Sequence, residues 1–158
     1  MKLRRAGFTL IELMITVTIV GLLARIAIPR VGQFRVRAHA ARIVGDLEVV
    51  RGAAFQVAAD SARYPAASSP GTIPADMTTY LPSSMSFTPE PGVSYVWRLT
   101  GMPGGDPGQA TEGATMGMGA DVTDDQLREE LQRQLAAQVT MTSGTAVYWL
   151  IWGPTIRP

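Results

Sequence analysis

The chain has 158 residues, of which 46% are hydrophobic, and its 14 basic and 13 acidic side chains nearly cancel. It contains no cysteine, which excludes disulfides, thiolate metal sites and a thiol nucleophile. A chain of this length can form one domain plus a membrane anchor.

The first seven residues form a short basic leader. Residues 1–7 contain Lys2, Arg4 and Arg5 and end in Gly7. This leader is too short to hold the apolar core of about 7 to 15 residues found in a secretory signal. Its charges are therefore expected to stay in the cytoplasm while the next segment enters the bilayer, and cleavage is expected before that segment.

Residues 8–28 predict a membrane-spanning helix. They are nearly all apolar, and at helical rise they cover about 30 Å, the thickness of a hydrocarbon core. The two charges, Glu12 and Arg25, lie near the ends, where their side chains can snorkel to the interface. An ionisable residue in a membrane span is a functional candidate by default. The alternative for Glu12 is a tolerated interfacial charge.

Residues 7–12, with the sequence Gly-Phe-Thr-Leu-Ile-Glu, resemble the signature of type IV prepilins and type II secretion pseudopilins. The resemblance covers the first third of the chain. It implies cleavage between Gly7 and Phe8 by a prepilin peptidase, followed by methylation of the Phe8 amine. It also implies that Glu12 meets the Phe8 amine of a neighbouring subunit and so sets the register between subunits.

Arg25 departs from this family, which usually has a small or apolar residue there. An unpaired guanidinium inside a helix bundle costs several kcal/mol, so Arg25 is predicted to pair across subunits or to lie at the membrane-distal rim of the apolar core. Pro29 follows, and its ring removes one helical hydrogen bond. A kink is therefore predicted at Pro29, with the helix continuing beyond it.

Residues 29–60 predict the amphipathic half of the same helix. Apolar residues recur there at spacings of four and three, as on one helix face. They are Val36, Ala40, Ile43, Leu47, Val50, Ala54 and Val57. The resemblance implies a lollipop shape, in which a membrane-buried first half is followed by a second half packed on a head. The arginines after residue 24 favour the opposite orientation by simple count, but that orientation would put the cleavage motif on the wrong side. The head is therefore expected outside the cytoplasm.

Residues 61–158 predict a small α+β head. Apolar and polar residues alternate over 93–100 as in a half-buried strand. Residues 145–152 are apolar on both faces, which indicates a central strand or one covered by a partner, and 139–142 could pair with it through a Ser143-Gly144 turn. Residues 101–120 read as a long loop without periodicity, either mobile or a contact surface.

A second amphipathic helix is predicted after that loop. Thr123 to Gln126 resembles a capping box, and the helix is expected to end near Gln138. Its inward face would carry Leu127, Leu131 and Leu135. The acidic residues on this helix are interpreted as a solvated face rather than as paired catalytic acids. They are Asp124, Asp125, Glu129 and Glu130.

No catalytic, metal or cofactor site is predicted. His39 is the only histidine of the chain and is expected on a helix surface. Asp121, Asp124 and Asp125 offer oxygen ligands but lack a calcium-loop pattern. From residue 61 onward there are five arginines against nine acidic residues, which makes nucleic acid an improbable partner of the head. A weak alternative rests on arginines of the long helix, namely Arg35, Arg37 and Arg42.

The sequence thus favours a non-enzymatic subunit of a type II secretion pseudopilus or type IV pilus in the inner membrane. Its expected parts are a leader (1–7), a transmembrane half-helix (8–28), an amphipathic half-helix (29–60) and a head (61–158). The resemblance implies three partners: the prepilin peptidase, copies of itself or related pilins, and an inner-membrane assembly platform with its ATPase. The alternatives are an anchored envelope-binding module that does not polymerise, a minor pilin for DNA uptake, and an anchored hydrolase.

Overall fold

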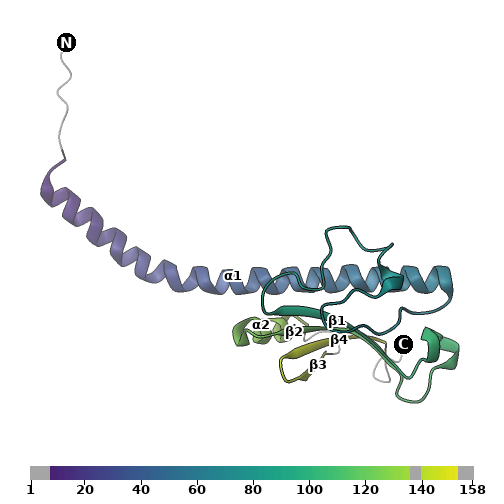
Figure 1. Cartoon of the computed structure of the whole chain (residues 1–158). Helices are drawn as coiled ribbons and strands as arrows, with labels where there is room; N and C mark the ends of the chain where they lie inside the picture. Colours follow the sequence, from purple (N-terminus) through teal and green to yellow (C-terminus); the bar gives the residue numbers. More distant parts are fainter. Residues whose placement is uncertain (1–7, 136–139, 153–158) are drawn as a thin grey trace, which may run out of the picture. The chain divides into compact units, whose positions relative to one another are not determined.

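The computed structural model describes residues 8–135 and 140–152 (Figure 1). Its fold is α+β, with a long N-terminal helix and a small antiparallel sheet, as the sequence predicts. Three short 3-10 turns lie in the connections, at Ala75–Met77, Pro103–Gly105 and Pro107–Gln109. The regular elements are α1 (Leu10–Ser61), β1 (Val93–Thr100), β2 (Thr115–Val122), α2 (Asp125–Leu135), β3 (Thr140–Ser143) and β4 (Ala146–Trp152).

The chain divides into two compact units, Met1–Val36 and Arg37–Pro158. The described part of the first unit is the N-terminal half of α1, which runs through position 29 without a break in its helical assignment. The expected continuation of the helix past this proline is therefore confirmed, and the kink at Pro29 stays a prediction.

In the second unit α1 buries one face. The stripe positions from residue 40 onward are at most 5% exposed, and they are Ala40, Ile43, Leu47, Val50, Ala54 and Val57. Removing a Leu or Ile side chain from water stabilises a fold by about 1.5–3 kcal/mol, so this stripe fixes the helix on the sheet. The helix ends at Ser61, whose Oγ donates to Val57 O at 2.7 Å, and Ala62 follows in the left-handed region with φ of 57°.

The four strands form one antiparallel sheet in the order β1-β2-β4-β3. β4 lies between β2 and β3, which confirms the central strand predicted for 145–152. β3 pairs with it through Ser143 and Ala146, next to the predicted turn. Two side chains of β1 tie the sheet to other segments: the Tyr95 hydroxyl donates to Asp46 Oδ2 on α1 at 2.8 Å, and Trp97 Nε1 donates to Pro65 O at 2.9 Å.

The loop expected for residues 101–120 is wrong in part, because most of β2, which covers residues 115–122, lies within it. Alternate residues of β2 are buried on one face, namely Met116, Met118, Ala120 and Val122. On the other face stand glycines: a Cβ at Gly119 would lie 2.6 Å from the Tyr148 ring, and one at Gly117 would lie 2.5 Å from Trp149 O. Glycine is unfavourable in strands and adds no side chain to an apolar pattern, which explains why the period of two was missed.

The remainder of the expected loop, residues 101–114, makes defined contacts with the chain itself. Tyr64 N donates to Gly105 O at 2.7 Å, and Thr111 N donates to Gly101 O at 2.8 Å. Gly105 has a positive φ of 75°, and a Cβ there would lie 2.1 Å from Tyr64 O. Only glycine therefore allows this close approach of the two backbones.

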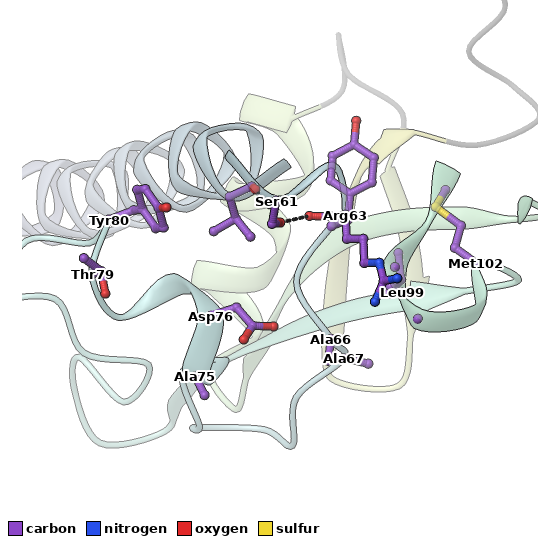
Figure 2. Close-up of a pocket in the computed structure, with 14 residues that line it drawn as sticks. Ser61, Arg63, Ala66, Ala67, Ala75, Asp76, Thr79, Tyr80, Leu99 and Met102 are labelled. Carbon is purple, nitrogen blue, oxygen red and sulfur yellow. Dashed lines mark hydrogen bonds between the residues drawn. The ribbon is translucent and has the colours of Figure 1, made fainter. Parts of the chain in front are cut away.

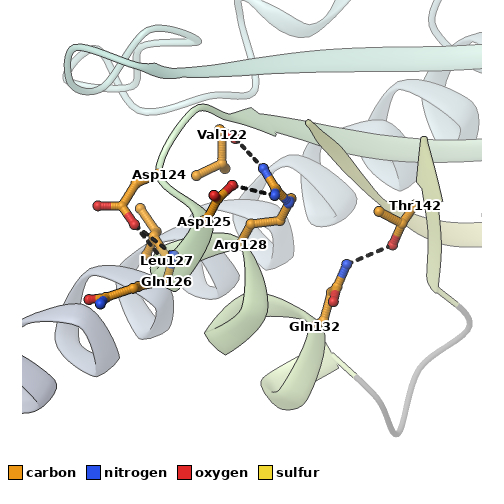
Figure 3. Close-up of polar contacts among 8 residues, drawn as sticks. All are labelled: Val122, Asp124, Asp125, Gln126, Leu127, Arg128, Gln132 and Thr142. Atoms are coloured by element: carbon orange, nitrogen blue, oxygen red, sulfur yellow. Dashed lines mark hydrogen bonds and ion pairs between the residues drawn. The ribbon is translucent and has the colours of Figure 1, made fainter. Parts of the chain in front are cut away.

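The N-cap of α2 is Asp124, one residue later than the predicted Thr123 (Figure 3). Asp124 Oδ1 accepts hydrogen bonds from Gln126 N at 2.8 Å and from Leu127 N at 3.0 Å. Thr123 Oγ1 instead donates to Gly92 O at 3.3 Å. Since Asp is as good an N-cap residue as Ser or Thr, sequence alone did not separate the two neighbours.

The inward leucines of α2 are buried as predicted, and they are Leu127, Leu131 and Leu135. The expected end near Gln138 lies outside the described residues. Glu130 is a second correction, because it is only 6% exposed rather than part of a solvated face. Its carboxylate pairs with Arg133 Nη1 at 2.6 Å and accepts from Gln134 Nε2 at 3.1 Å. Gln134 also donates to Arg37 O on α1 at 3.4 Å, so Glu130 lies on the flank of α2 nearest α1.

Candidate functional site

The first turn of α1 is closed by a reciprocal pair of hydrogen bonds. Glu12 Oε2 accepts from Thr9 N at 3.0 Å and from Thr9 Oγ1 at 2.8 Å. In return, Glu12 N donates to Thr9 Oγ1 at 3.3 Å. This is the geometry of a capping box, with Thr9 as N-cap and Glu12 three residues later.

The box fixes the direction of the Glu12 carboxylate. It faces back over the start of the helix, where the free N–H groups carry partial positive charge and favour an anion. Sequence reasoning identified Glu12 as a functional candidate but missed its contact with Thr9. The sequence does contain the signal, because Thr9 and Glu12 have the Thr-x-x-Glu spacing of a capping box.

The remainder of this half of α1 is apolar and exposed. It is the one helix among the described residues that is long and apolar enough to cross a membrane. The hydroxyls of two of its threonines are bonded within the helix: Thr16 Oγ1 donates to Leu13 O at 3.0 Å and Thr18 Oγ1 to Met14 O at 2.7 Å. A hydroxyl that is bonded within its own helix tolerates a medium without water.

The structure separates the predicted site residues. Phe8 precedes α1 and is 79% exposed, while Gly7 lies outside the described residues. Arg25 is exposed, thirteen residues and about 20 Å beyond Glu12 by helical rise. Within the described chain neither Glu12 nor Arg25 forms an ion pair. Phe8 and Glu12 therefore share the start of the helix, and Arg25 stands apart.

The head contains an open pocket of about 720 Å³ beside the C-terminal end of α1 (Figure 2). Arg63 and Asp76 line it, together with the hydroxyl groups of Ser61 and Tyr80. Both hydroxyls are engaged: Ser61 Oγ donates to Val57 O at 2.7 Å, and Tyr80 OH donates to Asp60 Oδ2 at 2.7 Å. Among the described residues that line the pocket there is no histidine or cysteine.

The other polar candidates from the sequence make structural contacts. His39 lies on the helix surface, where its side chain is 56% exposed and its Nδ1 is 3.6 Å from Glu90 Oε2. Asp124 caps α2, and Asp125 pairs with Arg128. Within residues 8–135 and 140–152, no three His, Cys, Asp or Glu side chains form a group that could hold a metal ion.

Comparison with known proteins finds similarity at this N-terminal segment. Residues 2–27 match the prokaryotic N-terminal methylation motif. The type II secretion system core protein G of Klebsiella pneumoniae is 36% identical over 62 residues, which cover 39% of this chain and 44% of that protein. A fimbrial protein of Pseudomonas aeruginosa is 48% identical over 48 residues, covering 30% and 31% of the two chains. The type IV major fimbrial protein FimA of Dichelobacter nodosus is 45% identical over 51 residues, covering 32% and 33%.

The chain thus spans less than half the length of these curated relatives. No solved structure matches it. The matched residues include the apolar half of α1 with Thr9 and Glu12. The N-terminal segment of the chain is therefore similar to that of type IV fimbrial proteins and of a type II secretion core protein, and it carries the prokaryotic N-terminal methylation motif.

Proposed function

We propose that the chain is a structural subunit of a type II secretion pseudopilus or a type IV pilus. The observation that carries this proposal is the start of α1, where a methylation motif coincides with an exposed apolar helix and a carboxylate held over its first turn. The named relatives are subunits of both systems, and they support a structural rather than an enzymatic role.

In this proposal the leader 1–7 is removed after Gly7 and the new Phe8 amine is methylated. Residues 8–28 hold the subunit in the inner membrane, with residues 61–158 outside the cytoplasm. A prepilin peptidase, an inner-membrane platform and its ATPase are the partners in processing and extrusion. Assembly then exchanges lipid for the apolar helices of neighbouring subunits, because the apolar side chains of this half have no partners within the described chain.

Glu12 is proposed to fix the axial position of one subunit relative to the next. Its Oε2 holds Thr9, while its Oε1 makes no hydrogen bond among the described residues. That oxygen can accept a charge-assisted bond from the Phe8 amine of a neighbour, which is stronger than a bond between neutral groups. The capping box would keep the carboxylate in one orientation before the neighbour arrives.

Cleavage is tested by intact-mass analysis of the protein produced in cells with a prepilin peptidase. We expect the wild-type chain to begin at N-methylated Phe8. Gly7→Leu should accumulate precursor, because a side chain blocks an approach that a bare backbone allows. Gly21→Leu is the matched control, since a Cβ at Gly21 meets nothing within 4 Å. A mature wild-type protein that still begins at Met1 would reject the proposed processing.

Assembly is tested separately with Glu12→Leu. This variant should insert at least as well as wild type, because a charge that must be desolvated is gone, but it should yield no filaments. Glu48→Leu is the control, since Glu48 is exposed and pairs only with Arg51 at 3.3 Å in the described chain. Filament yield and cross-linking between subunits are the readouts. Wild-type yield from Glu12→Leu would leave Glu12 as a tolerated charge, and the absence of cross-links in wild type would favour an anchored module that does not polymerise.

A further inference from the structure

Three arginines surround α1 at the end of its apolar half and just beyond it, at Arg25, Arg30 and Arg35. All three are exposed on one continuous helix. They are spaced five residues apart, and at 3.6 residues per turn each lies about 140° around the axis from the one before. The three side chains therefore start from different thirds of the helix circumference. We refer to these three residues as the arginine collar.

Apolar side chains fill the gaps between the collar residues. Four large ones are exposed there, at Ile26, Ile28, Val31 and Phe34. By the same geometry they lie at about 100°, 300°, 240° and 180° from Arg25, so at least one of them lies in each of the three gaps between the arginines. The segment therefore has no separate apolar and polar faces. A neighbouring protein that contacted one side of the helix would leave charges on the other sides unmatched.

The collar also stands at a defined distance along the helix. Starting from Phe8, a hydrocarbon core of about 30 Å is used up near residue 28. Each headgroup layer outside that core adds about 5 to 8 Å. Arg30 then falls within the layer, Arg25 lies about one turn inside it and Arg35 about one turn outside. Because arginine side chains are long and can snorkel, all three guanidinium groups can reach the same layer.

The charge of this segment has no compensation within the described chain. No acidic residue occurs between Glu12 and Asp46 in the sequence. None of the three collar arginines forms an ion pair with a described residue. An arginine presents a planar fork of donors that matches the oxygens of a phosphate group.

We propose that, in the single subunit before assembly, the arginine collar binds the phosphate groups of anionic phospholipids on the head side of the membrane. This inference rests on the membrane insertion proposed above. A ring of lipid headgroups surrounds a single helix on every side, and so it can serve three arginines that point in different directions. The collar thereby selects anionic lipid around the subunit and sets the depth of the helix.

The test uses the full-length chain in vesicles of phosphatidylcholine that contain trace spin-labelled phosphatidylglycerol or phosphatidylcholine. The spectrum of each labelled lipid gives the fraction held at the protein surface. We expect wild type to favour phosphatidylglycerol, and the triple variant Arg25→Gln, Arg30→Gln, Arg35→Gln to lower this preference at least about fivefold, the effect of one arginine near an anionic surface. Glutamine keeps helix propensity. The matched control removes three arginines outside the collar, one on the second half of α1 and two in the head: Arg51→Gln, Arg63→Gln and Arg98→Gln.

Two further arms identify the ligand and separate this inference from the proposed function. Inorganic phosphate should reduce the lipid preference no more than sodium chloride of equal ionic strength; a specific loss with phosphate would indicate a free-anion site and reject lipid binding. Resistance to alkaline carbonate extraction reports insertion. If wild type and the triple variant both stay inserted but show the same lipid preference, the collar proposal is wrong while membrane anchoring stands. If wild type is extracted, both proposals fail.

Discussion

The two halves of α1 have the same secondary structure but different surroundings. In residues 40–57 an apolar stripe is almost completely buried against the chain's own sheet. In residues 8–34 the large apolar side chains are exposed on all sides of the helix. The second half is therefore folded by contacts within the chain, whereas the apolar surface of the first half is left uncovered by the described chain. Substitutions in the second half should change the unfolding equilibrium of the head, whereas substitutions in the first half should not.

The largest difference is expected for apolar truncations. Leu47 is fully buried, so Leu47→Ala should lower the free energy of unfolding of the head by about 2–5 kcal/mol. Ile19→Ala, in the exposed half, should leave that free energy unchanged. Urea unfolding of the full chain in detergent, followed by tryptophan fluorescence, compares the two variants. Equal losses would show that the first half also stabilises the head.

The next largest effect concerns pH and the bond between Tyr95 and Asp46. Burial raises the pKa of the Tyr95 hydroxyl above its ordinary value, and the hydrogen bond to Asp46 and the negative charge of Asp46 add to this. Above about pH 10 the unfolded chain loses this proton while the folded chain keeps it, so stability falls as pH rises, by at most about 1.4 kcal/mol per pH unit.

Tyr95→Phe should remove this part of the pH dependence. Its unfolding free energy should be lower than that of wild type at pH 7, because one buried hydrogen bond is lost, but it should decline less steeply above pH 10. Urea titrations at a series of pH values measure both slopes. Parallel slopes in the two proteins would contradict the assigned role of the hydroxyl.

A smaller effect is expected for Arg51 in the second half of α1. Its guanidinium carbon is 5.5 Å from the Trp149 ring centroid and 5.9 Å from that of Phe55. Arg51→Gln should cost about 0.5–1 kcal/mol of head stability through the lost cation–π contacts. Arg30→Gln in the first half should cost nothing in the same urea experiment. A loss in both variants would indicate a general effect of charge rather than of aromatic contact.

The smallest effect on the single subunit is expected for Arg25→Ala. Cleavage, insertion and head stability should all match wild type, since Arg25 has no ion-pair partner in the described chain. If Arg25 pairs across subunits, filaments of the variant should dissociate more readily and respond differently to salt. Filament dissociation measured over a salt series decides this. Identical behaviour of the two proteins would exclude pairing and leave contact with the interface or solvent.

The sequence predicted those helices and strands whose large side chains recur at the regular spacing of that element. The stripe of α1, the alternation in β1 and the apolar run of β4 depend on large residues at regular spacing, and all three elements were found where expected. β2 was missed because Gly117 and Gly119 occupy one face and leave it empty. Side chains are absent from that face because of a neighbouring strand: the ring of Tyr148 on β4 occupies the space next to Gly119. A local pattern does not contain such a partner.

The candidate site was also predicted only in part, because some of its contacts depend on geometry that a sequence pattern does not contain. Glu12 was conspicuous as a carboxylate in an apolar segment, but its contact with Thr9 is a matter of local geometry. Glu130 was assigned to a solvated face because acidic residues are rarely buried unless paired. Its pairing with Arg133 and Gln134 could follow from their spacing on the helix, whereas its burial depends on where α2 lies.

The outer edge of β1 has a consequence for chains held close together. On the side away from β2, Tyr95 N donates to Phe87 O and Tyr95 O accepts from Gly71 N, while Trp97 N and Trp97 O bond to Ser68. A free strand edge is a template on which another chain can add a strand and begin aggregation. Here the irregular segments before β1 already occupy these donors and acceptors. Copies crowded at high local concentration therefore cannot join by strand addition at Tyr95 and Trp97, which leaves helices and side chains to form the contacts between them.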